Sequence, residues 1–228
     1  MKTVIVLGHG RTGTSITAGM LHILGVKMSC NYNSQEGDRF NPKGYFEDPE
    51  FVFLTRDIFN DKYKLNQRRL SVKYFNKISA LIRIRDRQSL WGWKSIITHQ
   101  VLDVFMPHLM QRELLLIFVF RDMYSTAVSQ HIHQKEILSQ EQPIDEILKG
   151  VCDSNKKLVE LKRVYQKVPH VCLSYYHLKT KPVEQLKKLA ESLRIDLTQD
   201  HVDQCEKFVI GGYSSWSKSC RNDGLYFV

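Results

Sequence analysis

The chain has 228 residues, of which 43% are hydrophobic and 25% charged, and its formal net charge is +9. These values exclude a collagenous or disordered chain and predict one globular domain over residues 1–228. The positive balance favours an anionic ligand, such as a nucleotide, a nucleic acid, an acidic glycan or a membrane surface, without choosing among them.

The first predicted elements are a strand and a helix joined by a glycine-rich turn. Thr3–Leu7 is a short β-branched run that ends at Gly8, which is typical of a buried strand. Thr14–Leu24 has the pattern of the following helix, and Gly25 ends it. A glycine-rich turn between a strand and a helix is the setting of a phosphate-binding loop.

The turn departs from the phosphate-loop pattern G-x-x-x-x-G-K-[ST] at one position. Gly8, Gly13 and Ser15 fit, but Thr14 stands where the lysine belongs, and the basic residue lies inside the loop as Arg11. Such a loop can bind an anion with its backbone N–H groups and the helix dipole. It lacks the lysine that nucleoside triphosphatases direct at the terminal phosphates.

The next part of the chain is a predicted loop followed by a helix. Residues 29–46 are rich in Asn, Gly and Ser, which indicates a loop. Asp48 then provides a helix N-cap, with Pro49 at the first helical position and Glu50 in the first turn.

Residues 62–88, called the basic segment below, contain nine basic residues and a single acid, Asp86. The basic residues are Lys62, Lys64, Arg68, Arg69, Lys73, Lys77, Arg83, Arg85 and Arg87. Two interpretations stay open: a surface on the acceptor side of a site for an anionic ligand, or one or two solvated helices.

Strands and helices alternate through the rest of the chain. The predicted strands are Trp91–Ser95, Leu114–Phe120 and Val168–Tyr175. One predicted helix is capped at Thr98 and another at Asp122, and two more cover Glu141–Gln166 and Val183–Leu193. The longest apolar run, Leu114–Phe120, is far shorter than the roughly 20 residues that span a bilayer. We therefore expect an α/β fold with a central, mainly parallel sheet flanked by helices.

Ligands of such sheets bind beyond the carboxyl ends of the strands, where the turn after Leu7, Lys94 and Arg121 are expected to meet. Arg121 is expected to start a helix, and Ser129 lies eight residues on, about two turns along the same side. A guanidinium and a hydroxyl so placed suit a phosphate monoester. The alternative for Arg121 is a structural ion pair, for example with Asp122.

Four segments occur together in one order. They are Gly10-Arg11-Thr12-Gly13-Thr14-Ser15, Asn41-Pro42-Lys43-Gly44-Tyr45-Phe46-Glu47, Trp91-Gly92-Trp93-Lys94, and Phe120-Arg121-Asp122 with Ser129. This order resembles the PAPS-dependent sulfotransferases, PAPS being 3'-phosphoadenosine 5'-phosphosulfate. The run 171–178 and the helix to Leu193 also resemble the closing strand and helix of that family. The resemblance covers residues 3–195 and implies a fold similar to that of the P-loop NTPases.

The resemblance implies roles for the matching residues. Gly10, Arg11, Thr12, Gly13, Thr14 and Ser15 correspond to the loop that holds the 5'-phosphosulfate, and Arg121 and Ser129 to the pair that holds the 3'-phosphate. Lys94 and Arg11 are expected to stabilise charge in the transition state. The donor is PAPS, the product is PAP, and the resemblance implies no metal, which accounts for the missing lysine of the loop.

The general base is expected to differ from that of the cytosolic branch, whose Lys-Thr-His run supplies a histidine. The lysine matches Lys94, but Ile96 occupies the histidine position. Glu47 is our candidate, because other branches use a glutamate from the loop after the first helix. An acid that only favours the helix N-terminus is the alternative for Glu47. His99 is the second candidate for the base.

The sequence thus predicts a cytoplasmic sulfotransferase whose acceptor hydroxyl or amine belongs to a small molecule or a saccharide, with an anionic one as an option. We expect no nucleic-acid or membrane partner, and the oligomeric state carries no signal. Residues 209–228 are expected to be a nucleotide-covering loop or a tail. The rival functions are a small-molecule kinase, with Asp122 as its magnesium ligand, and a non-catalytic nucleotide- or glycan-binding protein.

Overall fold

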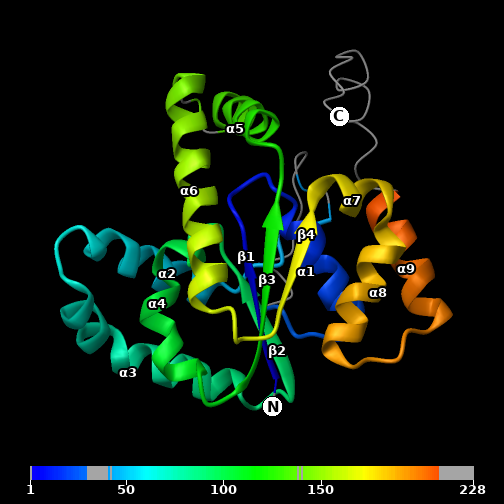
Figure 1. Cartoon of the computed structure of the whole chain (residues 1–228), viewed down its shortest axis with the longest axis horizontal. Helices are drawn as coiled ribbons and strands as arrows, with labels where there is room; N and C mark the ends of the chain where they lie inside the picture. The colour runs from blue at the N-terminus through cyan, green and yellow to red at the C-terminus, as the bar shows by residue number, and fades with distance from the viewer. Residues whose placement is uncertain (1, 30–40, 42, 138, 140, 211–228) are drawn as a thin grey trace.

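The computed structural model describes residues 2–29, 41, 43–137, 139 and 141–210 (Figure 1). The strands are β1 (Lys2–Leu7), β2 (Leu90–Lys94), β3 (Glu113–Phe120) and β4 (His170–Ser174). The helices are α1 (Thr14–Ile23), α2 (Pro49–Lys62), α3 (Gln67–Arg85), α4 (Thr98–Leu109), α5 (Met123–Ile137), α6 (Ile144–Val164), α7 (Tyr175–Thr180), α8 (Pro182–Leu193) and α9 (Gln199–Ile210).

The strands form one parallel sheet in the order β2-β1-β3-β4. The register pairs Val6 with Lys94, Leu7 with Phe118, and Phe120 with Ser174. The carboxyl ends of all the strands therefore lie at one edge, which is the upper edge in Figure 1. This confirms the predicted α/β fold with a parallel sheet flanked by helices.

Helices cover both faces of the sheet, and side chains of β1 and β3 alternate between two cores. Ile5, Leu116 and Phe118 pack with α2, α3, α4 and α6 on one face. Val4 and Ile117 pack with α1, α8 and α9 on the other. Figure 1 shows the two helical layers on opposite sides of the strands. The run Leu114–Phe120 is continuously apolar because alternate side chains point to opposite faces of the sheet, and both faces are covered by helices.

Two predicted helix caps are confirmed. Asp48 accepts a hydrogen bond from the backbone N–H of Glu50 at 3.0 Å, with Pro49 at the start of α2. Asp122 accepts from the N–H of Ser125 at 2.7 Å and so starts α5.

Two other predicted helix starts are wrong by one or two residues. Thr98 is the first residue of α4 rather than its cap, because its side chain is fully buried and Ile97 takes the cap position. Arg121 lies before α5 rather than at its start, because Asp122 caps the helix and Met123 begins it. Its side chain is therefore placed by the loop after β3.

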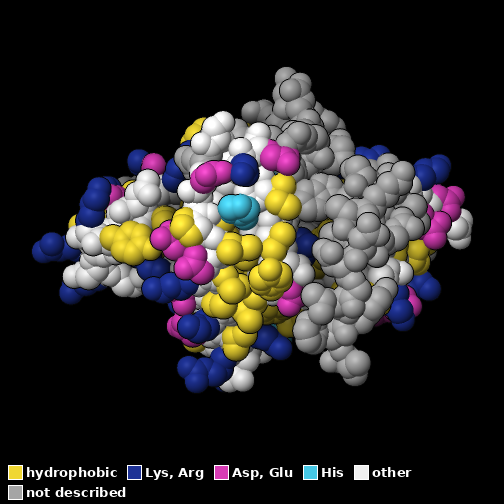
Figure 2. Space-filling model, turned by 90° about the horizontal axis from the view of Figure 1, so that it is seen from above, with side chains coloured by type: hydrophobic (Ala, Val, Ile, Leu, Met, Phe, Trp, Pro, Cys, Tyr) yellow, Lys and Arg dark blue, Asp and Glu magenta, His cyan; other side chains and the backbone are white. Residues whose placement is uncertain are grey.

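The basic segment runs from the end of α2 through α3 to the turn before β2. Some of its cations are matched by acids from outside the segment, since Lys73 pairs with Asp61 and Arg85 pairs with Asp48. Figure 2 shows Lys and Arg side chains at the side of the molecule where Figure 1 places α3, and others at the opposite side.

Helices α7 and α9 were not among the predicted elements. Of the segment 209–228, Val209 and Ile210 end α9, and the rest lies outside the described residues. In the described part of the chain, no helix combines the length and the apolar character needed to cross a bilayer.

Candidate functional site

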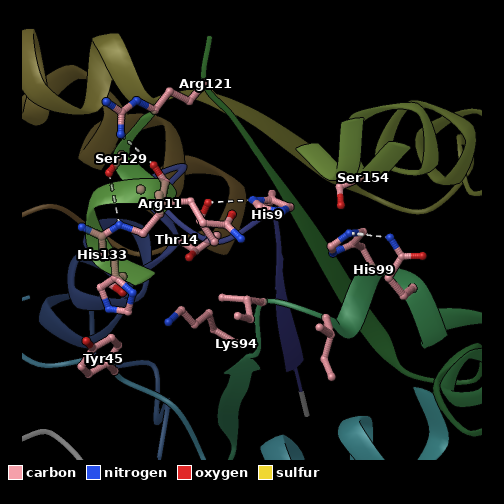
Figure 3. A pocket seen from close by; sticks show the side chains of 18 of the residues that line it. His9, Arg11, Thr14, Tyr45, Lys94, His99, Arg121, Ser129, His133 and Ser154 are labelled. Carbon is pink, nitrogen blue, oxygen red and sulfur yellow. Dashed lines mark hydrogen bonds between the residues drawn. The ribbon is translucent and has the colours of Figure 1, made fainter. Parts of the chain in front are cut away.

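A cavity of about 680 Å³ opens at the carboxyl edge of the sheet. One part, called the loop end, is lined by Gly10, Arg11, Gly13, Thr14, Ser15, Arg121, Ser129, His133 and Tyr175. Another part, called the helical end, is lined by Phe59, Tyr63, Ile96, Ile97, His99, Gln100, Gln130, Gln134, Gly150, Asp153 and Ser154. Figure 3 shows His9 and Lys94 between the two ends.

The turn between β1 and α1 builds the loop end. Gly13 is the N-cap of α1 and has φ 96°, a backbone conformation that glycine adopts readily. The hydroxyl of Thr12 donates to the carbonyl oxygen of His9 at 2.7 Å and closes the turn. Because glycine has no side chain that could cap α1, the first N–H groups of this helix suit an anion.

Two arginines and a serine from distant parts of the sequence meet at this turn. Arg121 donates from Nη1 to the carbonyl oxygen of Arg11 at 2.9 Å, and Arg11 donates from Nε to Oγ of Ser129 at 3.3 Å. The guanidinium of Arg121 lies 4.2 Å from the centre of the Tyr175 ring. No carboxylate pairs with Arg121 among the described residues. The alternative of a structural ion pair for Arg121 is therefore not observed there, and Figure 3 shows the cluster.

Lys94 and Glu47 form an ion pair on the cavity wall. Lys94 Nζ donates to Glu47 Oε1 at 2.8 Å, and the side chain of Lys94 is only 2% exposed whereas that of Glu47 is 25% exposed. The ring of Tyr45 lies 5.7 Å from the ammonium, within range of a cation–π contact. A buried ammonium needs such partners, because its desolvation is costly. The pair places an acid and a base at the end of β2.

The backbone before α2 explains how Glu47 reaches the cavity. Phe46 has φ 54°, a left-handed conformation that is strained for a bulky residue. Its ring is buried in the core beside α1 and α9, while Tyr45 and Glu47 on either side of it line the cavity. The helix-capping role belongs to Asp48, so the interpretation of Glu47 as a mere helix-terminal acid is not needed.

Two histidines line the cavity, His9 between its two ends and His99 at the helical end. Burial lowers the pKa of His99 to about 3, with a smaller contribution from His9, so its ring is neutral at neutral pH. Burial also lowers the pKa of His9, against a hydrogen bond between its Nδ1 and the Gly10 carbonyl oxygen at 2.9 Å. A histidine with so low a pKa is a weak base, which counts against His99 as the proton acceptor.

Nearly all the residues that the sequence singled out line this one cavity. They are Gly10, Arg11, Gly13, Thr14, Ser15, Glu47, Lys94, Arg121 and Ser129. Thr12 is the exception: it is fully buried, and its hydroxyl is used inside the turn. Of the basic segment, Tyr63 alone among the described residues lines the cavity.

Sequence reasoning missed several cavity residues. Tyr175 directly follows β4 and His9 directly follows the first glycine after β1, so the strand-end rule that selected Lys94 and Arg121 would have found both. Gln130 and Ser154 carry no such signal, because their position depends on how α5 packs against α6.

The acid considered as the magnesium ligand of a kinase has a structural role in this fold. Asp122, the acid that such an enzyme would use, is exposed, caps α5 and does not line the cavity. No group of three or more His, Cys, Asp or Glu side chains in the described ranges is placed to hold a metal ion.

A family model described as "Sulfotransferase domain" matches residues 1–214. No curated protein matches the sequence. The match covers every residue of the loop, the Lys94–Glu47 pair and the Arg121–Ser129 pair.

Solved structures with a similar fold include the sulfotransferase STF9 from Mycobacterium avium, with a TM-score of 0.61 and 14% identity over 92% of this chain and 68% of that chain. Mouse sulfotransferase SULT7A1 complexed with PAP has a TM-score of 0.58 and 13% identity over 94% and 66%. The sulfotransferase domain from the Synechococcus PCC 7002 olefin synthase has a TM-score of 0.53 and 15% identity over 96% and 82%. At these identities the likeness concerns the fold.

Proposed function

The chain belongs to the sulfotransferase domain family, and we propose that it transfers a sulfuryl group from PAPS to a hydroxyl or amine acceptor and releases PAP. The observation that carries this proposal is the meeting of the lysine-free loop with Arg121 and Ser129 at one end of a single cavity. The mouse relative of similar fold was solved with PAP, which agrees with a donor of this kind.

The residues at the loop end fit such a donor. The uncapped N-terminus of α1 and the backbone of residues 10–15 suit the 5'-phosphosulfate. Arg121 and Ser129 suit the 3'-phosphate, since a hydroxyl offers one donor beside its acceptor sites. In this structure Ser129 accepts from Arg11, so its own O–H can still donate to a phosphate.

The reaction needs one bond to break and one to form. Bound PAPS supplies an electrophilic sulfuryl group whose leaving group is the phosphate of PAP. The S–O bond to that phosphate breaks as the acceptor oxygen or nitrogen bonds to sulfur. We assign to Lys94 and Arg11, which both line the cavity, the role of offsetting the negative charge that develops on the leaving group. Glu47 takes the proton that the acceptor loses.

The donor assignment is tested by calorimetry with PAP and with AMP, which differ only in the 3'-phosphate. We expect PAP to bind at least tenfold more tightly, because AMP leaves Arg121 and Ser129 without their ligand. Arg121→Ala should remove most of this preference. Arg163→Ala, which removes an exposed arginine of α6, serves as the control and should keep it. Equal affinities of the unaltered protein for PAP and AMP would refute the assignment.

The role of Glu47 is tested with Glu47→Gln, which keeps the size of the side chain and an oxygen for Lys94. Transfer from ³⁵S-labelled PAPS to a panel of alcohols, phenols and amines should fall by a factor of 100 or more, because general-base catalysis contributes about 10²–10⁴-fold. PAP should bind at least as tightly as before, because the variant removes a negative charge beside Lys94. Undiminished transfer by this variant would exclude Glu47 as the base and leave His99 as the candidate.

A further inference from the structure

The helical end of the cavity has one apolar wall and one polar wall. Phe59 from α2 and Ile96 and Ile97 from the turn after β2 supply hydrocarbon surface. Gln130 from α5 and Ser154 from α6 supply uncharged hydrogen-bonding groups. An acceptor bound here would meet apolar surface on one side and amide and hydroxyl groups on the other.

The polar groups of this end are not all used by the protein itself. Oε1 of Gln130, Oε1 of Gln134 and Nδ1 of His99 have no hydrogen-bond partner among the described residues. The neutral ring of His99 accepts a hydrogen bond at Nε2 from Nε2 of Gln100, at 3.0 Å. The proton of the ring is therefore on Nδ1, which can donate to a ligand. Unsatisfied buried polar groups are costly, and these can turn to meet hydroxyl or amide groups of a ligand.

The charges along the cavity are unevenly distributed. The Lys and Arg side chains among its described lining residues are Arg11, Lys94 and Arg121, and the acids are Glu47 and Asp153. Arg11 and Arg121 belong to the loop end, and Lys94 already pairs with Glu47. A donor with two phosphates and a sulfuryl group would occupy these cations. At the helical end the charged lining residue is Asp153, and its carboxylate already pairs with Lys156 at 3.2 Å. No Lys or Arg among the described residues that line this end is therefore available to pair with a charged acceptor.

The basic segment contributes little to this wall. Lys62 of this segment contacts a residue of the helical end, because its Nζ donates to the carbonyl oxygen of Gln100 at 2.9 Å. Burial lowers the pKa of Lys62, and the neighbouring Lys157 acts in the same direction. Lys62 is not among the residues that line the cavity.

We propose that the acceptor is an uncharged ring compound with one apolar face and hydroxyl or amide groups on its other side, such as a neutral glycoside or a hydroxylated aromatic. The inference rests on the proposed sulfuryl transfer and sharpens it. An anionic acceptor would be repelled by the bound donor, and no Lys or Arg among the described lining residues of the helical end would compensate its charge. Like charges brought together without compensation are costly.

The test compares acceptors that differ only in one carboxylate. The first pair is the methyl ester of 4-nitrophenyl β-D-glucuronide and the free glucuronide, and the second is 4-hydroxybenzamide and 4-hydroxybenzoate, so that both members of a pair carry the same hydroxyl groups. The readout is kcat/KM for transfer from ³⁵S-labelled PAPS. We expect the uncharged member of each pair to be favoured at least tenfold. Equal use, preference for the carboxylates, or transfer to none of the four by a protein that binds PAP would overturn the proposal.

A charge placed on the wall provides a second readout. Gln134→Lys should reduce the ratio of kcat/KM between the uncharged and the charged member of each pair. The new lysine places a cation at the helical end that can pair with the carboxylate of the acceptor. Gln204→Lys makes the same change on the exposed face of α9 and should leave the preference as it is. Lys62→Met should also leave it unchanged. A selective loss of carboxylate transfer in Lys62→Met would instead assign the acceptor to the basic segment.

Failure of this inference can be told apart from failure of the proposed function. Calorimetry with PAP involves no acceptor, so absence of PAP binding speaks against the donor assignment alone. A protein that binds PAP and sulfates the carboxylates first keeps its proposed function and loses the inference.

Discussion

At the residue scale, Lys94 shows how the site stabilises a buried positive charge. Its ammonium is almost completely buried, and it contacts the carboxylate of Glu47 and the face of Tyr45. Removing one member of a buried pair leaves the other uncompensated, which is more costly than losing an exposed pair. The two residues therefore depend on each other before any ligand arrives, and a ligand anion adds to the compensation of Lys94.

His99 gives the residue-scale prediction. Its pKa is about 3 in the folded protein and about 6.5 in the unfolded chain, chiefly because burial disfavours the charged ring. Between these two values the unfolded chain binds the extra proton, so stability rises with pH. The contribution is complete above pH 6.5 and is lost as the pH falls toward 3, by at most about 1.4 kcal/mol per pH unit.

The prediction is checked by urea unfolding of the protein and of His99→Gln between pH 7.5 and 4.5. The variant should show a shallower fall of the unfolding free energy below pH 6.5. His177→Gln changes an exposed histidine and should leave the slope as it is. If all three proteins have the same slope, His99 does not have the lowered pKa that its burial implies.

At the scale of elements, α3 holds the start of α2. Arg85 at the end of α3 donates from Nε to Asp48 Oδ2 at 2.7 Å and from Nη2 to Oδ1 at 3.0 Å, and it also contacts Glu50. Asp48 is the N-cap of α2 and directly follows Glu47. A helix that contributes no described side chain to the cavity thus fixes the residue next to the candidate base.

Arg85→Met should lower the unfolding free energy by about 3–5 kcal/mol, because it leaves the carboxylate of Asp48 buried without its partner. Adding Asp48→Asn should recover a large part of the loss, since asparagine still caps a helix and carries no charge. Denaturant unfolding measures both changes. Arg83→Met, on an exposed position of the same helix, should stay within about 0.5 kcal/mol. An equal, small effect of Arg83→Met and Arg85→Met would show that the buried pair contributes nothing.

The elements that the sequence predicted well are those with a strong local signal. The strand Leu114–Phe120 was recognisable because both faces of a covered parallel sheet must be apolar. The caps at Asp48 and Asp122 were recognisable because short acidic side chains bind helix N–H groups. Helix α9 was missed, since its packing on α1 and α8 is set by the whole fold and not by a local motif.

The site divides in the same way. Lys94 and Arg121 could be placed from the sequence because parallel strands bring their carboxyl ends to one edge. The bond between Arg11 and Ser129 joins residues 118 positions apart, and the sequence gives no distance for it. The Lys94–Glu47 pair likewise depends on the left-handed backbone conformation of Phe46. A phenylalanine gives no sequence signal for that conformation.

At the scale of the whole molecule, the last described helix packs against the first. Phe208 of α9 lies against α1, where a Cβ added at Gly19 would overlap its ring. The same ring makes an edge-to-face contact with Phe46 at 5.8 Å. Phe208 therefore touches both the helix that follows the phosphate loop and the residue before Glu47. The two halves of the site depend on a contact made near the end of the described chain.

Two glycine-to-alanine substitutions distinguish the effect of this packing on stability from the effect of helix propensity. Gly150→Ala in α6 should stabilise the protein by about 0.5–1 kcal/mol, because alanine is the better helix former and the added methyl group meets nothing within 4 Å. Gly19→Ala offers α1 the same gain in propensity but should destabilise the protein, because the methyl group displaces the ring of Phe208. Unfolding free energies from urea titrations give both signs.

A double-mutant cycle decides whether Phe208 is the cause. Phe208→Ala alone should destabilise the protein by creating a cavity between α1 and α9. In that background Gly19→Ala no longer meets the ring, so its effect should change sign and become stabilising by about 0.5–1 kcal/mol. If Gly19→Ala destabilises the Phe208→Ala protein as much as the unaltered one, the strain lies within α1, and α9 does not set the position of the phosphate loop.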